Sequence, residues 1–423
     1  MPTIRKKILA VLLGALAAVA VAEVALRAAG FSHPPFYRPD ETRGWAPAPA
    51  TSGWYTAEGR SWVETNAAGL REGELPLARP PGEYRIAVLG DSMTEGLQVA
   101  REATFVEVLE RRLAACAALP PGYRDVEAIN FGVSGYGTAQ ELLTLRHVAL
   151  AYRPQLVVLA FYAGNDVAND ERAIDGDPRR PYFELAGGEL LLDDSFRDTR
   201  AHRLRTLPGI GLAYAAARHS RLLQLAAVIK TRLGQPAAAL PAAGGEPPPS
   251  PSDAVYLAQP DEAWRRAWEV TEALVAASAA ESRRAGAGFL LLTLSTGVQA
   301  HPDAALRRRF TASLAAVSPP GEAPADLLHP ERRLAALARR EGFDMLALAP
   351  RLARRAAAGG EPFHGAGGFG HYDAAGHRAV AGIVADDLCR RWARASDGGV
   401  AGGGPAAAGD GDGSGSLATA GGS

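Results

Sequence analysis

The chain has 423 residues, of which 47% are apolar and 22% charged, enough for one large catalytic domain with attachments or for two ordinary domains. These proportions exclude a wholly disordered chain, and a formal net charge of −1 gives no net field that would draw nucleic acid to the protein. Only two cysteines are present, which excludes a disulfide-dense scaffold and a cysteine-ligated zinc cluster.

The first predicted element is an apolar segment at residues 8–22, directly after basic residues at positions 5–7. A bilayer span needs about 20 apolar residues, and this run reaches Leu26 if Glu23 lies at the far interface. Residues 1–30 are therefore predicted to be either a cleaved signal peptide or an uncleaved membrane anchor with its basic end inside. In both cases the rest of the chain would work outside the cytoplasm.

Oxidising conditions there would allow Cys116 and Cys389 to pair. Two buried free thiols are an equal alternative at this stage.

Five short apolar runs alternate with helical periods along the rest of the chain. The predicted strands are residues 84–89, 126–131, 155–161, 288–294 and 343–348. The predicted helices are residues 105–117, 138–152, 262–285, 334–341 and 374–393. This alternation predicts an α/β fold, a three-layer α/β/α sandwich around a parallel sheet of about five strands. In such sheets the chemistry lies at the carboxyl ends of the strands.

We assign residues 31–395 to one α/β domain, with an insertion at about 167–260. Within the insertion, residues 236–253 are rich in Pro, Ala and Gly and are predicted to form a flexible loop. Residues 396–423 are a Gly- and Ala-rich tail that cannot form a core, so we expect it to be disordered.

A serine follows the first predicted strand, in the sequence GDSMTEG at residues 90–96. Ser92 in a glycine-flanked turn from strand to helix is exposed, and its own N–H lies near the helix start. That placement suits a nucleophile whose backbone also donates to an oxyanion. An ordinary helix N-cap would have a similar sequence.

Three more polar or glycine positions follow strands or precede the last helix. Gly135, after the second strand, can bring its N–H close to a ligand. Asn165, after the third strand, can aim its amide at the same oxyanion. His371, before the last helix, could return to the sheet end and deprotonate Ser92. Each position alone has a plain structural explanation, but the four in this order are harder to dismiss.

This set resembles the SGNH hydrolases, also called the GDSL esterase/lipase family, over roughly residues 60–395 outside the insertion. Gly-Asp-Ser at 90–92 matches the nucleophile block, with Met93 in place of the usual Leu. Gly135 in NFGVSG and Asn165 in GND match the second and third blocks. The last block matches HYDAAGH, which begins at His371. The upstream sequence TNAAGLR looks like the lead-in of membrane-anchored bacterial members.

The resemblance implies a flavodoxin-like fold and a serine ester hydrolase, with Ser92 as nucleophile and His371 as base. Gly135 and Asn165 would hold the oxyanion together with the N–H of Ser92. It implies no metal and no organic cofactor, and as substrates O-acyl esters of carbohydrates, lipids or small molecules. Two alternatives remain open: an O-acyltransferase that modifies cell-surface polysaccharide, and a non-catalytic glycan-binding module.

One position departs from the family pattern. The usual Asp three residues before the catalytic His is Gly368 here, so the group that orients His371 is open. Asp373 is a candidate, although alternation along the chain would point it elsewhere, and a backbone carbonyl or water is another. Glu361 also lies three residues before a histidine, His364, but the Gly-His helix start does not follow it. We therefore prefer His371 as the base.

Overall fold

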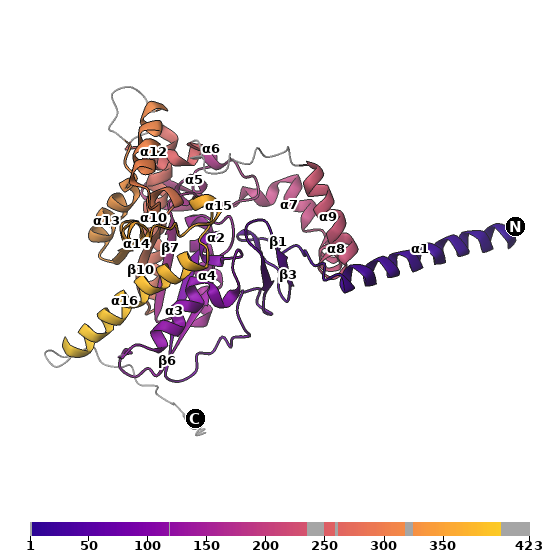
Figure 1. Cartoon of the computed structure of the whole chain (residues 1–423), viewed down its shortest axis with the longest axis horizontal. Coiled ribbons are helices and arrows are strands. Elements are labelled where there is room, and N and C mark those ends of the chain that lie inside the picture. Colours follow the sequence, from indigo (N-terminus) through magenta and orange to yellow (C-terminus); the bar gives the residue numbers. More distant parts are fainter. Residues whose placement is uncertain (1, 118, 235–248, 259–260, 318–324, 399–423) are drawn as a thin grey trace, which may run out of the picture.

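The computed structural model describes residues 2–117, 119–234, 249–258, 261–317 and 325–398. A five-stranded sheet, in the order β11-β10-β7-β5-β6, lies at its centre (Figure 1). The strands are β5 (Glu83–Gly90), β6 (Asp125–Asn130), β7 (Leu156–Tyr162), β10 (Gly288–Leu294) and β11 (Asp344–Ala347). Every pairing in this sheet is parallel. The predicted three-layer α/β/α fold and the number of strands are confirmed.

Both faces of the sheet are buried, which explains why its strands are apolar at consecutive positions. In β5, Ala87 and Leu89 pack into the core on one face, while Ile86 and Val88 pack into the core on the other. The first face is covered by α4 (Thr138–His147), α10 (Glu262–Arg284) and α13 (His329–Glu341). The second is covered by α3 (Phe105–Ala114), α14 (Ala349–Gly359) and α16 (Ala374–Gly398).

The predicted elements agree with the observed ones to within a few residues, with three differences. Helix α13 begins at His329, five residues before its predicted start. Helices α12 (Ala304–Val317) and α14 were not predicted. Helix α16 continues to Gly398, so three residues of the predicted disordered tail are helical, and the remainder lies outside the described residues.

Two antiparallel hairpins precede the sheet. The first pairs β1 (Tyr37–Asp40) with β2 (Gly44–Pro47), and the second pairs β3 (Ser52–Tyr55) with β4 (Ser61–Glu64). They lie between the N-terminal helix α1 (Pro2–Ala28) and β5.

The insertion contains the hairpin of β8 (Tyr182–Ala186) and β9 (Glu189–Asp193) and the helices α5 (Asp166–Asn169), α6 (Arg172–Asp175), α7 (Arg200–Arg205), α8 (Pro208–His219) and α9 (Arg221–Gly234). Most of the predicted flexible loop at 236–253 lies outside the described residues. Its end begins a short 3-10 helix, Pro251–Tyr256.

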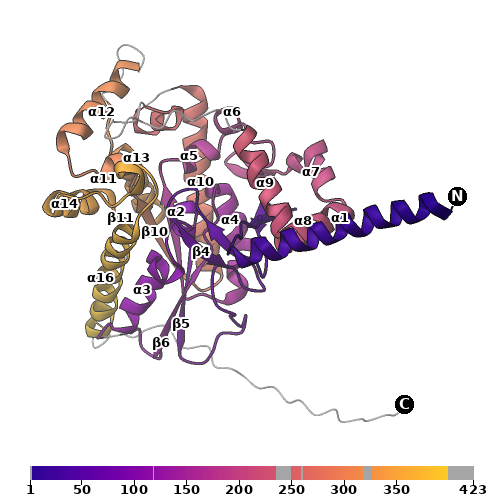
Figure 2. The ribbon, with the colours of Figure 1, turned by 45° about the vertical axis from the view of Figure 1, so that its right-hand side comes forward.

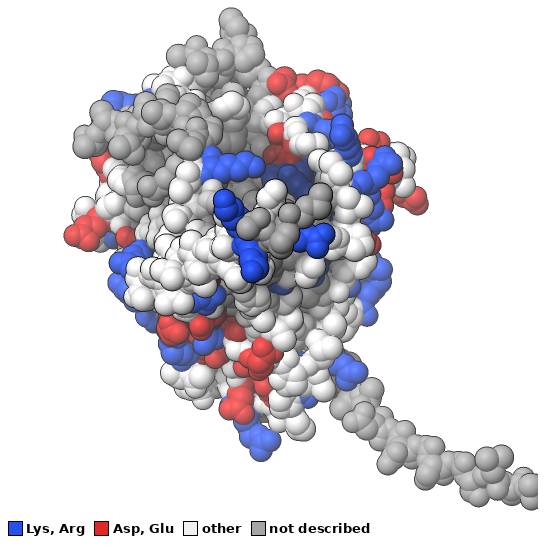
Figure 3. Space-filling view, turned by 90° about the vertical axis from the view of Figure 1, so that its right-hand side faces the viewer, with Lys and Arg blue, Asp and Glu red and all other residues white. Residues whose placement is uncertain are grey.

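Helix α1 projects from the molecule beside α8 and α9 (Figure 1, Figure 2). Its segment Ile4–Ala28 is long and apolar enough to cross a membrane, and none of its most apolar stretch is buried within the protein. Near the C-terminal end of α1, Glu23 accepts hydrogen bonds from the N–H groups of Arg221 and Leu222, at 2.9 and 3.1 Å. The start of α9 is therefore fastened to the last turns of α1. In Figure 3 this end of the molecule faces the viewer, and basic side chains gather near the middle of a largely uncharged face.

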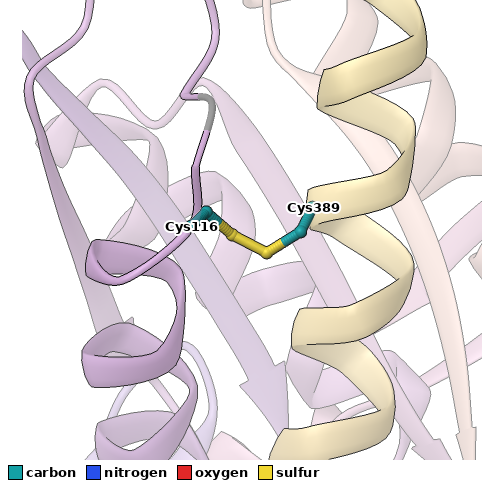
Figure 4. The surroundings of a disulfide bond; sticks show 2 residues. All are labelled: Cys116 and Cys389. Atoms are coloured by element: carbon teal, nitrogen blue, oxygen red, sulfur yellow. A yellow bond between two sulfur atoms is a disulfide. The ribbon is translucent and has the colours of Figure 1, made fainter.

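A disulfide joins the end of α3 to α16. Cys116 and Cys389 are bonded, with their Cα atoms 6.0 Å apart, across 273 residues of sequence (Figure 4). Of the two interpretations left open by the sequence, the structure therefore has the paired one. The bond joins the turn that follows α3 to α16 and closes residues 116–389 into one loop.

Loss of this disulfide should destabilise the folded chain by about 2–4 kcal/mol, because closing so long a loop removes much of the entropy of the unfolded state. The measurement is urea unfolding of the detergent-solubilised chain, comparing the parent with the double variant Cys116→Ser, Cys389→Ser. Reductant should lower the stability of the parent by a similar amount and leave the double variant unchanged. Equal stability of parent and double variant would contradict this role of the bond.

Candidate active site

The serine lies at the turn that follows β5. Asp91 caps the short helix α2 (Ser92–Glu95), with its Oδ1 accepting the N–H of Met93 at 2.9 Å. Gly90 lets the strand enter this turn, since a Cβ there would lie 2.1 Å from Oγ1 of Thr94. The turn leaves Ser92 half-buried at the carboxyl end of the strand.

The structure brings His371 to this serine. His371 lies in the loop between α15 (Gly365–Gly368) and α16, and its Nε2 is 2.8 Å from Oγ of Ser92. A hydroxyl at this distance can donate to an imidazole nitrogen that carries no proton. The pair can therefore transfer a proton from the serine to the histidine during nucleophilic attack.

The second nitrogen of the imidazole is held by Glu58, a residue that sequence reasoning missed. Glu58 lies in the turn between β3 and β4, and its Oε2 is 2.6 Å from Nδ1 of His371. Its Oε1 accepts the backbone N–H of His371 at 2.9 Å. The hydrogen bond from His371 lowers the pKa of Glu58, which keeps its carboxylate ionised at neutral pH. An ionised acceptor on Nδ1 places the imidazole proton there and leaves Nε2 free to accept from Ser92.

Asp373 does not take this place. Its Oδ1 accepts the N–H of Gly376 at 2.7 Å, which makes it the N-terminal cap of α16. The backbone conformation at Gly368 disfavours an acid at the position where the family pattern has one. Its φ is +99°, and a Cβ there would meet side-chain atoms of His301 and Pro362 at 3.1 Å. An aspartate at this position would be strained as well as crowded.

Two other histidines near His371, His364 and His377, are buried and hydrogen-bonded to backbone groups. His364 has its Nε2 at 3.1 Å from the carbonyl oxygen of Ser295, and burial lowers its pKa to about 4. His377 accepts the N–H of Phe105 at 3.1 Å through Nδ1, and burial lowers its pKa to about 3. Both rings are neutral at physiological pH, and of the three only His371 is hydrogen-bonded to Ser92.

The two candidate oxyanion residues lie at the same edge of the sheet. Strands β6, β5 and β7 are neighbours, so the turns that follow them, which carry Gly135, Ser92 and Asn165, lie close together. Gly135 has a φ of +78°, a conformation that favours glycine. Nδ2 of Asn165 donates to the carbonyl oxygen of Tyr136 at 3.3 Å, which joins the second and third blocks.

Buried polar side chains fasten these turns to one another and to the first hairpin. The carboxylate of Glu95 accepts from the hydroxyl of Tyr37 at 2.6 Å and from the N–H of Ser134 at 2.7 Å. Arg71 donates to the carbonyl oxygens of Glu95 and Gly96, at 2.9 and 2.6 Å. The turn that carries Ser92 is therefore held by Arg71 and, through Glu95, by Tyr37 and Ser134.

Asn130 makes a similar link at the end of β6. Its Nδ2 donates to the carbonyl oxygen of Thr94 at 2.8 Å, and its own N–H is accepted by Oε1 of Glu72 at 2.9 Å. Burial raises the pKa of Glu72 to about 8. Within the described part of the chain, no group of three or more His, Cys, Asp or Glu side chains is arranged to hold a metal ion.

The chain is similar to one family of known sequences and to several solved structures. The family model described as GDSL-like Lipase/Acylhydrolase matches residues 88–331. Among solved structures, a catalytic mutant of Axe2, an acetylxylan esterase from Geobacillus stearothermophilus, is 12% identical and covers 72% of this chain and 94% of its own, with a TM-score of 0.36. TesA is 16% identical over 72% of this chain and 97% of its own, with a TM-score of 0.33. The acetyl xylan esterase AlAXEase is 14% identical and covers 72% of this chain and 99% of its own, with a TM-score of 0.35. The comparison with curated proteins finds no match.

The raised pKa of Glu72 gives the fold a pH dependence of known sign. The folded state holds this proton up to about pH 8, whereas the unfolded chain releases it near the ordinary value of 4.5. Stability contributed by the protonated carboxyl is therefore lost progressively as the pH rises between these values. Glu72→Gln, which keeps an acceptor for Asn130, should match the parent near pH 5 and exceed it by about 2–3 kcal/mol near pH 8.

Urea unfolding at the two pH values measures this difference. Glu74→Gln, an exposed carboxylate of the same loop, is the control and should show no comparable change with pH. An equal effect of Glu72→Gln at both pH values would rule out the titration of this group as the cause.

Proposed function

The chain belongs to the GDSL-like lipase/acylhydrolase family and is an ester-hydrolysing enzyme; from this premise we propose that it is an exported serine esterase that forms an acyl-enzyme. The observation that carries the proposal is the chain of hydrogen bonds from Glu58 through His371 to Ser92, with 2.6 Å between Oε2 and Nδ1 and 2.8 Å between Nε2 and Oγ. A nucleophile, a base and a group that orients the base are the parts that acyl transfer requires.

In the proposed reaction, Oγ of Ser92 attacks the acyl carbonyl while its proton passes to Nε2 of His371. The carboxylate of Glu58 stabilises the imidazolium that results. The N–H groups of Ser92 and Gly135 and the amide of Asn165 donate to the developing oxyanion. Collapse of this intermediate breaks the ester bond, and the alcohol leaves with the proton from His371. Water then attacks the acyl-enzyme, gives its proton to His371, and releases the acid.

The natural substrates in this proposal are O-acyl esters of carbohydrates, lipids or small molecules, with O-acetyl esters among them. An O-acyltransferase would use the same site with a sugar hydroxyl in place of water, and an acceptor-dependent product separates it from the hydrolase. The only argument for a non-catalytic glycan-binding module was the missing acid at position 368. The hydrogen bond between Glu58 and His371 removes that argument.

We propose further that α1 is a single membrane anchor and that the catalytic domain is extracytoplasmic. The apolar segment Ile4–Ala28 and the basic residues at 5–7 support the anchor and its orientation. The disulfide between Cys116 and Cys389 supports an oxidising compartment. The alternative is a secreted or periplasmic protein released by cleavage, which the mass of the mature chain distinguishes.

Removal of the nucleophile or of the base should abolish turnover. Ser92→Ala and His371→Ala, in the full chain in detergent, should each lower kcat for short-chain p-nitrophenyl esters by at least about 10³-fold. A fluorophosphonate probe should label the parent at Ser92 and leave Ser92→Ala unlabelled. Turnover by Ser92→Ala at the parental rate would contradict the proposed nucleophile.

Glu58→Gln should lower kcat by about 10²- to 10⁴-fold with KM changed by less than about threefold, because the carboxylate acts through the imidazole and not on the substrate. Glu58→Asp should restore part of the rate. The matched control is Asp373→Asn, which keeps an acceptor for the N–H of Gly376 and should stay within about threefold of the parent. If Asp373→Asn were as damaging as Glu58→Gln, the orienting role assigned to Glu58 would be wrong.

A further inference from the structure

A cleft of about 390 Å³ opens beside the candidate oxyanion residue Gly135. Four separate segments form it: the β1–β2 hairpin, the turn that carries Ser134 and Gly135, residues 177–180 of the insertion, and the helices α7 and α8. Gly135 forms part of its wall, so the cleft borders the turn that carries the candidate oxyanion residue.

Four arginines are among the residues that line this cleft, namely Arg38, Arg179, Arg180 and Arg205. Asp177 is the one carboxylate among its described lining residues, and it is bound by Arg179 with 2.9 Å between Oδ1 and Nε and 2.6 Å between Oδ2 and Nη2. The chain as a whole has a net charge of −1, so this local excess of positive charge does not follow from a generally basic surface.

Two of these arginines differ from the others. Within the described part of the chain, the guanidinium groups of Arg38 and Arg205 make no side-chain hydrogen bond and no ion pair, and both residues are exposed. Arg180, by contrast, is buried and bound to Asp175 at 2.9 Å. Arg38 and Arg205 are therefore free to bind a ligand, while the paired arginines shape the cleft.

Trp45 fixes the cleft to the oxyanion turn. Its indole N–H donates to the carbonyl oxygen of Ser134 at 3.1 Å, and its ring lies 3.4 Å from the position that a Cβ of Gly135 would take. The guanidinium carbons of Arg179 and Arg180 lie 5.5 and 5.3 Å from the ring centroid. A ligand group held in the cleft would thus be kept at a set position relative to Gly135.

We propose that this arginine cleft is a substrate subsite for an anionic group, a carboxylate or a phosphate, on the same molecule as the ester. Guanidinium groups bind both anions through paired hydrogen bonds, and a cleft of one charge sign concentrates ligands of the opposite sign. A neutral ester would offer no negative charge to the guanidinium groups of Arg38 and Arg205. The inference rests on the proposed function and narrows its substrate class to anionic esters.

The test compares pairs of esters that differ in charge and little else, with the full chain in detergent. One pair has the anion on the acyl side, p-nitrophenyl hemiglutarate against p-nitrophenyl pentanoate. The other has it on the alcohol side, para-acetoxybenzoate against its methyl ester. In at least one pair kcat/KM should favour the anionic member by about tenfold or more, which is what one charge-assisted hydrogen bond supplies. Rising ionic strength should reduce this preference.

The double variant Arg38→Gln, Arg205→Gln should remove the preference and keep hydrolysis of the neutral ester within about twofold of the parent. Arg200→Gln, an exposed arginine outside the cleft on the same helix as Arg205, is the control for loss of a positive charge on α7 and should keep the preference. The subsite is overturned if neither anionic ester is preferred, or if the preference survives the double variant. Turnover of the neutral esters reports on the proposed esterase separately, and its absence would count against that function first.

Discussion

The two hydrogen bonds between Glu58 and His371 join parts of the chain that are 313 residues apart. One bond orients the imidazole, and the other holds the backbone of the loop in which it lies. The hairpin that carries Glu58 must therefore be docked on the α/β domain before the site is complete. Glu95 and Arg71 serve the same docking, since each is a buried polar side chain with a partner across the boundary between residues 31–82, which include both hairpins, and the rest of the domain. A buried polar group that loses its partners is costly, so these contacts disfavour a state in which residues 31–82 are not docked.

The same segment connects the domain to α1. Its first residues are fastened on both sides: the carbonyl oxygen of Ser32 accepts the N–H of Trp54 in β3 at 2.8 Å, and the N–H of His33 donates to Gln224 in α9 at 2.8 Å. Helix α9 is in turn held by Glu23 of α1. A short series of contacts thus runs from the apolar helix to the turn that holds Glu58. The position of α1 on the domain and the position of Glu58 beside His371 therefore depend on one set of contacts.

Much of the fold and half of the proton-transfer chain follow from local sequence. Consecutive apolar residues such as those of β5 can only be buried on both faces, which predicts a central parallel strand, and the turn after it exposes Ser92. His371 is found because HYDAAGH, which begins at this residue, resembles the last block of the family pattern. The insertion was harder, since its helices α7 and α8 have no buried residues and their placement depends on contacts with distant segments. Glu58 could not be identified either. A Glu-Gly pair in a hairpin turn is an ordinary surface sequence, and no local feature relates it to a histidine at the other end of the chain.

The glycine at position 368 and the contact of Glu58 with His371 depend on the same loop, residues 365–370. The glycine loop before His371 packs so closely that a Cβ on the facing Gly297 would lie 2.2 Å from the carbonyl oxygen of Gly368. At the other end of the loop, a Cβ on Gly365 would lie 3.1 Å from Oε1 of Glu58. A loop without side chains at these positions leaves room for a carboxylate to approach His371 from the opposite side. An acid within the loop would need the space that its glycines keep open. The carboxylate on His371 comes instead from the β3–β4 hairpin, which precedes residues 88–331, the range that the family model matches. The missing acid at position 368 is therefore compatible with the proposed activity, because the segment between α1 and β5 places the Glu58 carboxylate on His371.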